Sequence, residues 1–241
     1  MSRYVLPALI ASDLDPLFAI EILMLFGMLI ANYSIISLLG LRPGQTQADA
    51  ESFSISLLKA AYVPLVLILT LVVYAMARSL EDGRFLTYIS FPYSSSKVTS
   101  YMFAYSAIYP AALAAAVFTG DSWAFSLFTW PLVPAELIFY TLCFSVMFAG
   151  IGLFLAVLTR SSILASGIPG SLYIFILPAI ISHNVNSSFM YAIAGLYLLK
   201  SGDPLSTTYI YGGIFEILMG IVLFIASMVL VRRRNLRPAR R

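Results

Sequence analysis

Six long apolar runs divide this chain, and they constrain its fold more than any other feature of the sequence. Each is close to the ~20 residues that an α-helix needs to cross the hydrocarbon layer of a bilayer. Backbone inside lipid must satisfy its own hydrogen bonds, and the alternating pattern of barrel strands is absent, so we expect helices. The windows are residues 16–39, 56–77, 98–118, 134–158, 163–181 and 210–231. The sequence therefore predicts an all-α, polytopic integral membrane bundle of six transmembrane helices.

The composition excludes a soluble fold. The chain is 61% hydrophobic and only 10% charged, whereas a soluble domain is about one half apolar and one quarter charged. A chain of 241 residues cannot bury so much apolar surface within itself. No polar stretch is long enough for a separate domain, so we expect residues 1–241 to form a single transmembrane domain.

The basic residues of the short loops predict the orientation. Eleven of them fall on one side of the predicted membrane and three on the other. Because loops rich in Lys and Arg stay inside, we expect both termini in the cytoplasm of a multi-pass cell-membrane protein. We interpret the basic tail, residues 232–241, as an anchor on anionic headgroups rather than a patch for nucleic acid.

The predicted outer side holds residues 182–209, whose apolar run 189–199 is too short to cross a bilayer. This run is rich in Tyr and Phe, which favour the membrane–water interface, so we expect short interfacial helices there. Asn186 begins an outward-facing N-x-S glycosylation pattern, and the sequence leaves its modification open.

The fifth span carries the string Gly167, Pro169 and Gly170. Such residues free backbone carbonyls that neighbouring helices must satisfy. They predict either a hinge that lines a pathway or the ordinary Gly and Pro content of membrane helices.

Three ionisable residues share a depth near the outer ends of their spans, namely Lys59, Glu136 and Glu216. From this shared depth alone we expect an ion pair between Lys59 and one of the two carboxylates at the outer mouth. None of the spans carries a chain of such residues from which a proton relay could be assembled.

Enzyme motifs are mostly missing. No G-x-x-x-x-G-K-[ST] phosphate loop occurs, so we expect no ATP hydrolysis, cofactor or metal on this chain. One constellation, Cys143, Arg160 and His183, matches the residue types that membrane-embedded sortase-like transpeptidases use. The predicted depths separate Arg160 from His183 by most of the bilayer, which argues against such a site. A transpeptidase-like enzyme nevertheless stays an alternative.

Residues 78–97, RSLEDGRFLTYISFPYSSSK, form the one substantial polar segment on the predicted cytoplasmic side. Residues 78–89 have helix-forming character, and Pro92 ends that stretch. The serines at 94–96 can cap the helix that begins near Lys97. We expect either a short amphipathic helix that transmits a push from below or a plain polar connector.

This loop resembles that of permeases of ATP-binding cassette (ABC) transporters, in the type-2 exporter family. The family has Glu, Gly and, nine residues later, Pro-x-Ser after its second helix. Glu81, Gly83, Pro92 and Ser94 stand here at that spacing. The string GIGLFLAVLTRSS, residues 150–162, is also similar to the family's junction between the fourth and fifth helices. Arg84 stands where Thr is usual, and Ser95 where Arg is usual.

The resemblance implies the membrane subunit of an ATP-driven exporter. Two separate ABC-type ATPase subunits would bind ATP and Mg²⁺, and a second permease subunit, identical or related, would complete the pathway. The surface that meets the ATPase would include or adjoin Glu81, Gly83, Arg84, Pro92 and Ser94. A non-transporting membrane scaffold or immunity-type protein is a further alternative. The sequence leaves the substrate open.

Overall fold

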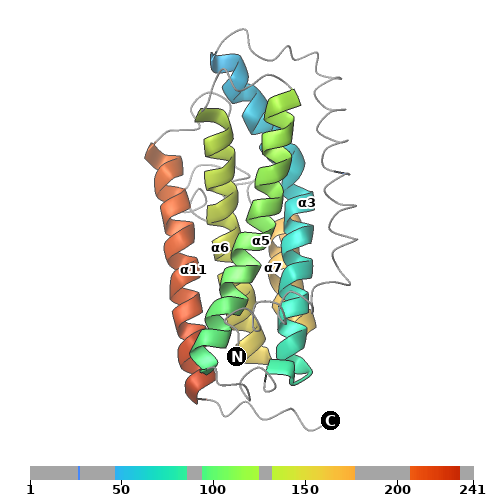
Figure 1. The fold of residues 1–241 in the computed structure, drawn as a ribbon, viewed down its shortest axis with the longest axis vertical. Coiled ribbons are helices and arrows are strands. Elements are labelled where there is room, and N and C mark those ends of the chain that lie inside the picture. The colour runs from blue at the N-terminus through green and yellow to red at the C-terminus, as the bar shows by residue number, and fades with distance from the viewer. Residues whose placement is uncertain (1–26, 28–46, 86–93, 125–131, 177–206, 234–241) are drawn as a thin grey trace, which may run out of the picture.

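The computed structural model describes residues 27, 47–85, 94–124, 132–176 and 207–233, and the regular structure among them is all helical (Figure 1). The predicted all-α fold is confirmed for these residues. The elements in chain order are α3 (Gln47–Glu81), α5 (Ser95–Ala124), α6 (Leu132–Thr159), α7 (Ser162–Ser171), the π-helix η2 (Leu172–Ile176) and α11 (Thr207–Arg233). The long helices lie side by side along the long axis of the molecule.

Four of these helices are long and apolar enough to cross a membrane, which makes the chain a helical membrane protein. Their apolar stretches are Tyr62–Glu81, Ser95–Val117, Ile138–Thr159 and Ile210–Arg233. They fall on the second, third, fourth and sixth predicted windows. The fifth window contains a shorter apolar helix, Ser162–Ile176. The first window except residue 27, the outer segment up to residue 206 with Asn186, and the tail after residue 233 lie outside the described residues.

The helices extend beyond the windows that hydropathy predicts. α3 begins at Gln47 and ends at Glu81, whereas the predicted span covers residues 56–77. At about 1.5 Å per residue, its 35 residues exceed a hydrocarbon layer of about 30 Å. Hydropathy predicts only the part of a helix that lies in lipid. Backbone hydrogen bonding extends the helix beyond it into the polar region.

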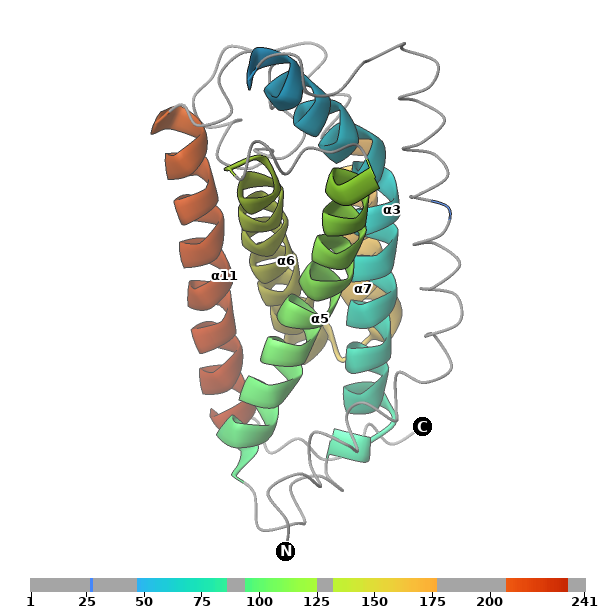
Figure 2. The ribbon, with the colours of Figure 1, turned by 45° about the horizontal axis from the view of Figure 1, so that its top comes forward.

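α6 is the central helix of the bundle. It packs against α3, α5, α7 and α11, and 67% of its apolar stretch is buried, compared with 22% of that in α11. α11 packs mainly against α6. α5 also approaches α11 near their lower ends in Figure 2. The rings of Phe103 on α5 and Phe224 on α11 stack with centroids 4.4 Å apart.

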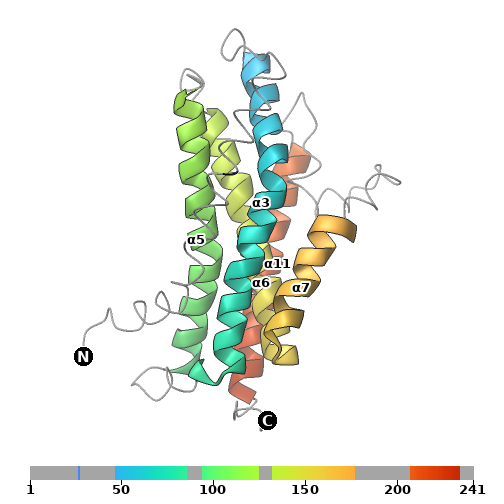
Figure 3. The ribbon, with the colours of Figure 1, turned by 90° about the vertical axis from the view of Figure 1, so that its right-hand side faces the viewer.

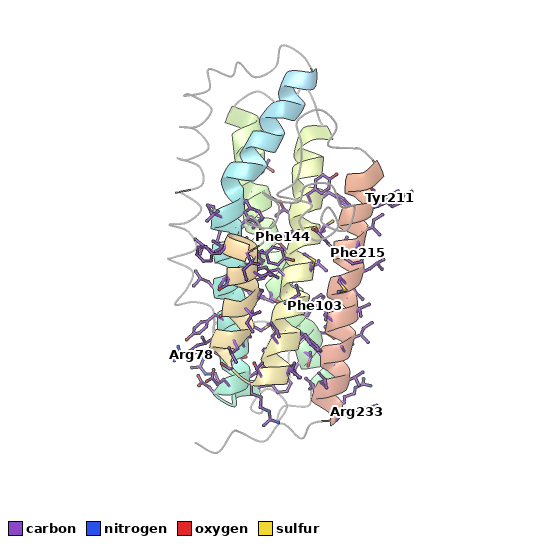
Figure 4. All side chains as sticks on the ribbon, turned by 180° about the vertical axis from the view of Figure 1, so that it is seen from behind. Arg78, Phe103, Phe144, Tyr211, Phe215 and Arg233 are labelled. Atoms are coloured by element: carbon purple, nitrogen blue, oxygen red, sulfur yellow. The ribbon has the colours of Figure 1, made fainter. Side chains whose placement is uncertain are left out.

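Large apolar side chains cover much of the outer surface. Tyr211 and Phe215 of α11 point away from the bundle (Figure 4), and Tyr211 is 69% exposed. A soluble protein rarely exposes a continuous apolar face of this kind. Lipid is the solvent that matches it.

One end of the bundle gathers basic side chains, and we call it the basic end. There α3, α6 and α11 end and α5 and α7 begin; Figure 4 shows Arg78 and Arg233 at this end. Its described basic residues are Arg78, Arg84, Lys97, Arg160, Arg232 and Arg233. The sequence predicts that this end is cytoplasmic.

Candidate functional site at the basic end

Glu81, the last residue of α3, is bonded to the first residue of α7. Its Oε2 atom accepts hydrogen bonds from the backbone N–H of Ser162 at 2.9 Å and from the Ser162 hydroxyl at 2.6 Å. The first N–H groups of a helix have no partner inside it, and its N-terminus carries partial positive charge. The Glu81 carboxylate therefore caps α7 from another helix. We call this pair the Glu81–Ser162 clasp.

The turn between α6 and α7 presents Ser162 to this carboxylate. Arg160 has a φ of 56°, a left-handed conformation that costs a non-glycine residue roughly 1–2 kcal/mol. Its N–H donates to the Ala156 carbonyl at 2.9 Å. Ser161 follows as the N-cap of α7, and its hydroxyl accepts from the N–H of Leu164 at 3.4 Å. The chain thus reverses within two residues, which keeps the ends of α6 and α7 together.

The chain that leaves α3 is held close to the clasp. Asp82 donates its N–H to the Arg78 carbonyl at 2.8 Å, and Gly83 has a φ of 77°, the left-handed conformation that glycine adopts without strain. Helical backbone resumes at Arg84 and Phe85. Phe85 is only 2% exposed. Its burial anchors the start of the loop beneath the bundle.

Two exposed contacts complete the basic end. Arg78 Nε lies 3.4 Å from Asp82 Oδ2, one helical turn away. Arg232 Nε donates to the Ser96 hydroxyl at 2.9 Å, which joins the end of α11 to the start of α5. Exposed ion pairs contribute little to stability because water screens them. The partly buried clasp is the stronger link between helices.

Part of the coupling set that the family resemblance implies lies at the basic end. Glu81, Gly83 and Arg84 lie in succession at the end of α3. Ser94 lies where the chain re-enters the bundle, and its hydroxyl accepts from the N–H of Lys97 at 3.3 Å. The serine run therefore caps α5, as its composition predicts. Residues 86–93, with Pro92, lie outside the described residues.

The expected hinge residues of the fifth span lie within a continuous helix. α7 runs through Pro169 to Ser171 without a break. A Cβ atom on Gly170 would come within 2.8 Å of the Thr70 hydroxyl, so this glycine permits close contact between α7 and α3. A Cβ atom on Gly167 would meet nothing within 4 Å.

Glu216 is enclosed by protein, being 1% exposed on α11. Lys59 and Glu136 lie on the helical backbones of α3 and α6, and their side chains are outside the described part. The expected ion pair at the outer mouth stays a prediction.

The residues of the transpeptidase alternative are spread along the molecule. Cys143 is fully buried in α6, and Arg160 follows it by 17 residues, about 25 Å along a helix axis. His183 lies outside the described residues. Within the described ranges, no group of three or more His, Cys, Asp or Glu side chains is placed to hold a metal ion.

Sequence reasoning missed Ser162 as a partner of Glu81. The two residues are 81 positions apart, and no periodicity links them. The signal available was Thr-Arg-Ser-Ser between two apolar runs, which is typical of a helix N-terminus that seeks a cap. Comparison of the chain with models of protein families, with curated proteins and with solved structures gives no significant match.

Proposed function

We propose that this chain is the membrane-spanning permease subunit of an ATP-driven ABC transporter that works as an exporter. The observation that carries the proposal is the Glu81–Ser162 clasp. It joins the start of the candidate coupling loop to the fifth predicted span at the end of the bundle that gathers the basic residues. In this proposal the basic end faces the cytoplasm, where ATPase subunits bind ATP and Mg²⁺.

The clasp gives the loop a direct route to a membrane helix. A push on the loop reaches Glu81 through Gly83 and the buried Phe85. Glu81 passes it to the N-terminus of α7 through two hydrogen bonds. α7 packs mainly against α3, and Figure 3 shows the two helices beside each other. Motion of the loop therefore shifts α3 and α7 as a pair.

The bundle is consistent with a permease whose conformational change is driven by another protein. A conformational equilibrium moves only when a ligand binds one state better than the other. The described part of the bundle contains no cluster suited to a metal ion, and the chain has no phosphate loop. ATP binding to partner subunits would supply this difference in affinity between the two states. A second permease subunit would complete the pathway.

The first test is isolation of the complex from native membranes. The proposal expects a phosphate-loop ATPase to co-purify and to hydrolyse MgATP in proteoliposomes with this chain. Purification of the chain without such an ATPase would favour the scaffold alternative. Turnover of any cargo, or cleavage of any bond, by the isolated chain would overturn the proposal.

The second test measures the movement of the α3–α7 pair against α11, in a Cys143→Ser background with spin labels on Ile163→Cys of α7 and Arg233→Cys of α11. Both positions lie at the basic end, on helices of which only α7 is held by the clasp, and Ile163 is 71% exposed. MgATP with vanadate should change the distance between the labels in the complex. Glu81→Ala and Gly83→Pro should abolish that change while membrane insertion and ATP hydrolysis persist.

Ser166→Ala is the matched control for the clasp. Ser166 lies one turn along α7, and its hydroxyl bonds only to the Ser162 carbonyl of its own helix, at 2.9 Å. This variant should keep the nucleotide-dependent change. A nucleotide response that survives in Glu81→Ala would remove the clasp from the coupling route.

A further inference from the structure

The fifth predicted span changes its helix type at η2. Leu172–Ile176 form a π-helix that directly continues α7. In a π-helix each carbonyl accepts from the N–H five residues ahead, and such segments occur often at functional sites. For Tyr173 that donor would be residue 178, which is a proline and has no N–H. The Tyr173 carbonyl therefore has no π-type donor.

Tyr62 of α3 supplies a donor instead. Its hydroxyl donates to the Tyr173 carbonyl at 2.9 Å, across 111 residues of sequence. Both tyrosines are almost fully buried. A buried carbonyl without a partner is costly, above all in lipid. The Tyr62 hydroxyl thus takes the place of the backbone N–H that the proline lacks.

The side chain of Tyr173 is held by α6. Its hydroxyl donates to Met147 Sδ at 3.6 Å. Its ring meets Phe144 edge to face with centroids 5.0 Å apart, and it lies 5.8 Å from Phe148. Figure 4 shows Phe144 pointing into the bundle. Tyr173 is therefore tied to α3 by its carbonyl and to α6 by its side chain.

The rest of η2 is anchored much less. Phe175 is 69% exposed and Ile176 is 48% exposed. Before η2, by contrast, α7 is fixed by the clasp at its first residue and by the contact of Gly170 with Thr70. Within the described part of the fifth span, Tyr173 is thus the last residue with a hydrogen bond to α3.

We infer that the fifth predicted span bends at η2 and that Tyr62 is the positioning residue that keeps η2 attached to α3. Loss of the Tyr62 hydroxyl frees residues 174–176 to move away from α3, while α7 stays attached through the clasp. Gly167 and Gly170 lie in α7, the part of the span that stays attached to α3, because Gly170 packs on α3. This inference does not depend on the ATP-driven function.

Amide hydrogen exchange of the purified full-length protein in nanodiscs tests this inference. Tyr62→Phe removes only the hydroxyl, and exchange of the amides at 172–176 should rise by about five- to tenfold, the change expected for one hydrogen bond. Exchange in α6 and in residues 164–171 should stay as in the wild type. Unchanged exchange at 172–176, or an equal rise throughout the bundle, would overturn the inference.

Two further variants separate the hydroxyl from general packing. Tyr74→Phe removes a hydroxyl from the same helix and should leave exchange at 172–176 unchanged, since Tyr74 makes no hydrogen bond to the described residues. Pro178→Ala restores a backbone N–H at the position five residues after Tyr173. It should therefore cancel the effect of Tyr62→Phe in the double variant, and failure of this rescue would also overturn the inference.

Discussion

Gly150 of α6 and Gly220 of α11 meet backbone to backbone. A Cβ atom on Gly150 would lie 2.6 Å from the Gly220 carbonyl oxygen, and one on Gly220 would lie 2.5 Å from the Val146 carbonyl oxygen. Real Cβ atoms do not approach backbone this closely, so one helix must move if either residue gains a side chain. In lipid, where apolar burial drives little association, such contacts between small residues hold helices together.

Gly220→Ala should therefore weaken the packing of α11 on α6. We expect a loss of about 1–3 kcal/mol of unfolding free energy, the usual cost of overpacking, measured by equilibrium unfolding in mixed micelles. Gly167→Ala is the control, because a Cβ there meets nothing within 4 Å. That variant should be neutral or stabilising by up to about 1 kcal/mol, the helix preference for Ala over Gly. Equal destabilisation by both variants would contradict the packing role of Gly220.

The Glu81–Ser162 clasp should appear as a coupling energy in a double-mutant cycle. Glu81→Ala removes both hydrogen bonds, whereas Ser162→Ala removes only the one from the hydroxyl. Glu81→Ala should cost more, and the cycle should give a coupling of about 1–2 kcal/mol because the acceptor is charged and partly buried. A cycle of Glu81→Ala with Ser166→Ala should give none. Additive effects in the first cycle would mean that the clasp does not form.

The sequence predicted four of the described helices as membrane spans, because lipid imposes a simple requirement on composition and length. The apolar stretches of α3, α5, α6 and α11 all overlap predicted windows. Their true ends differ, as α3 shows at Gln47, because helix termini depend on hydrogen bonding in the polar region rather than on hydropathy.

The candidate site was only half predictable. The serine run marked Ser94 as a cap, since that role depends on neighbours in sequence, whereas the turn at Gly83 interrupts a stretch for which the sequence predicted helix-forming character. The partner of Glu81, and the donor to the Tyr173 carbonyl, come from other helices. A single sequence specifies which groups need partners, and only the packing of the helices decides which residues supply them.

Gly83 should tolerate substitution according to its backbone conformation. With a φ of 77°, Gly83→Ala should cost about 1–2 kcal/mol of unfolding free energy. Gly83→Asn should cost less, since Asn enters the left-handed region more easily. Gly120→Ala, where a Cβ meets nothing within 4 Å, is the control and should not destabilise. An Asn variant less stable than the Ala variant would show that something other than φ selects glycine here.

Cys143 should be inert toward thiol reagents in the folded protein. Its side chain is fully buried in α6, and a Cβ on Gly213 of α11 would lie 3.2 Å from its sulfur, so the helix seam covers it. A maleimide should label Cys143 only after unfolding in SDS, and an added Arg233→Cys at the basic end should label at once as the positive control. A thiol nucleophile has to reach its substrate. Rapid labelling of Cys143 in the native protein, together with loss of function in Cys143→Ser, would therefore support the transpeptidase alternative. Protection of Cys143, together with full function of the Ser variant, would exclude it.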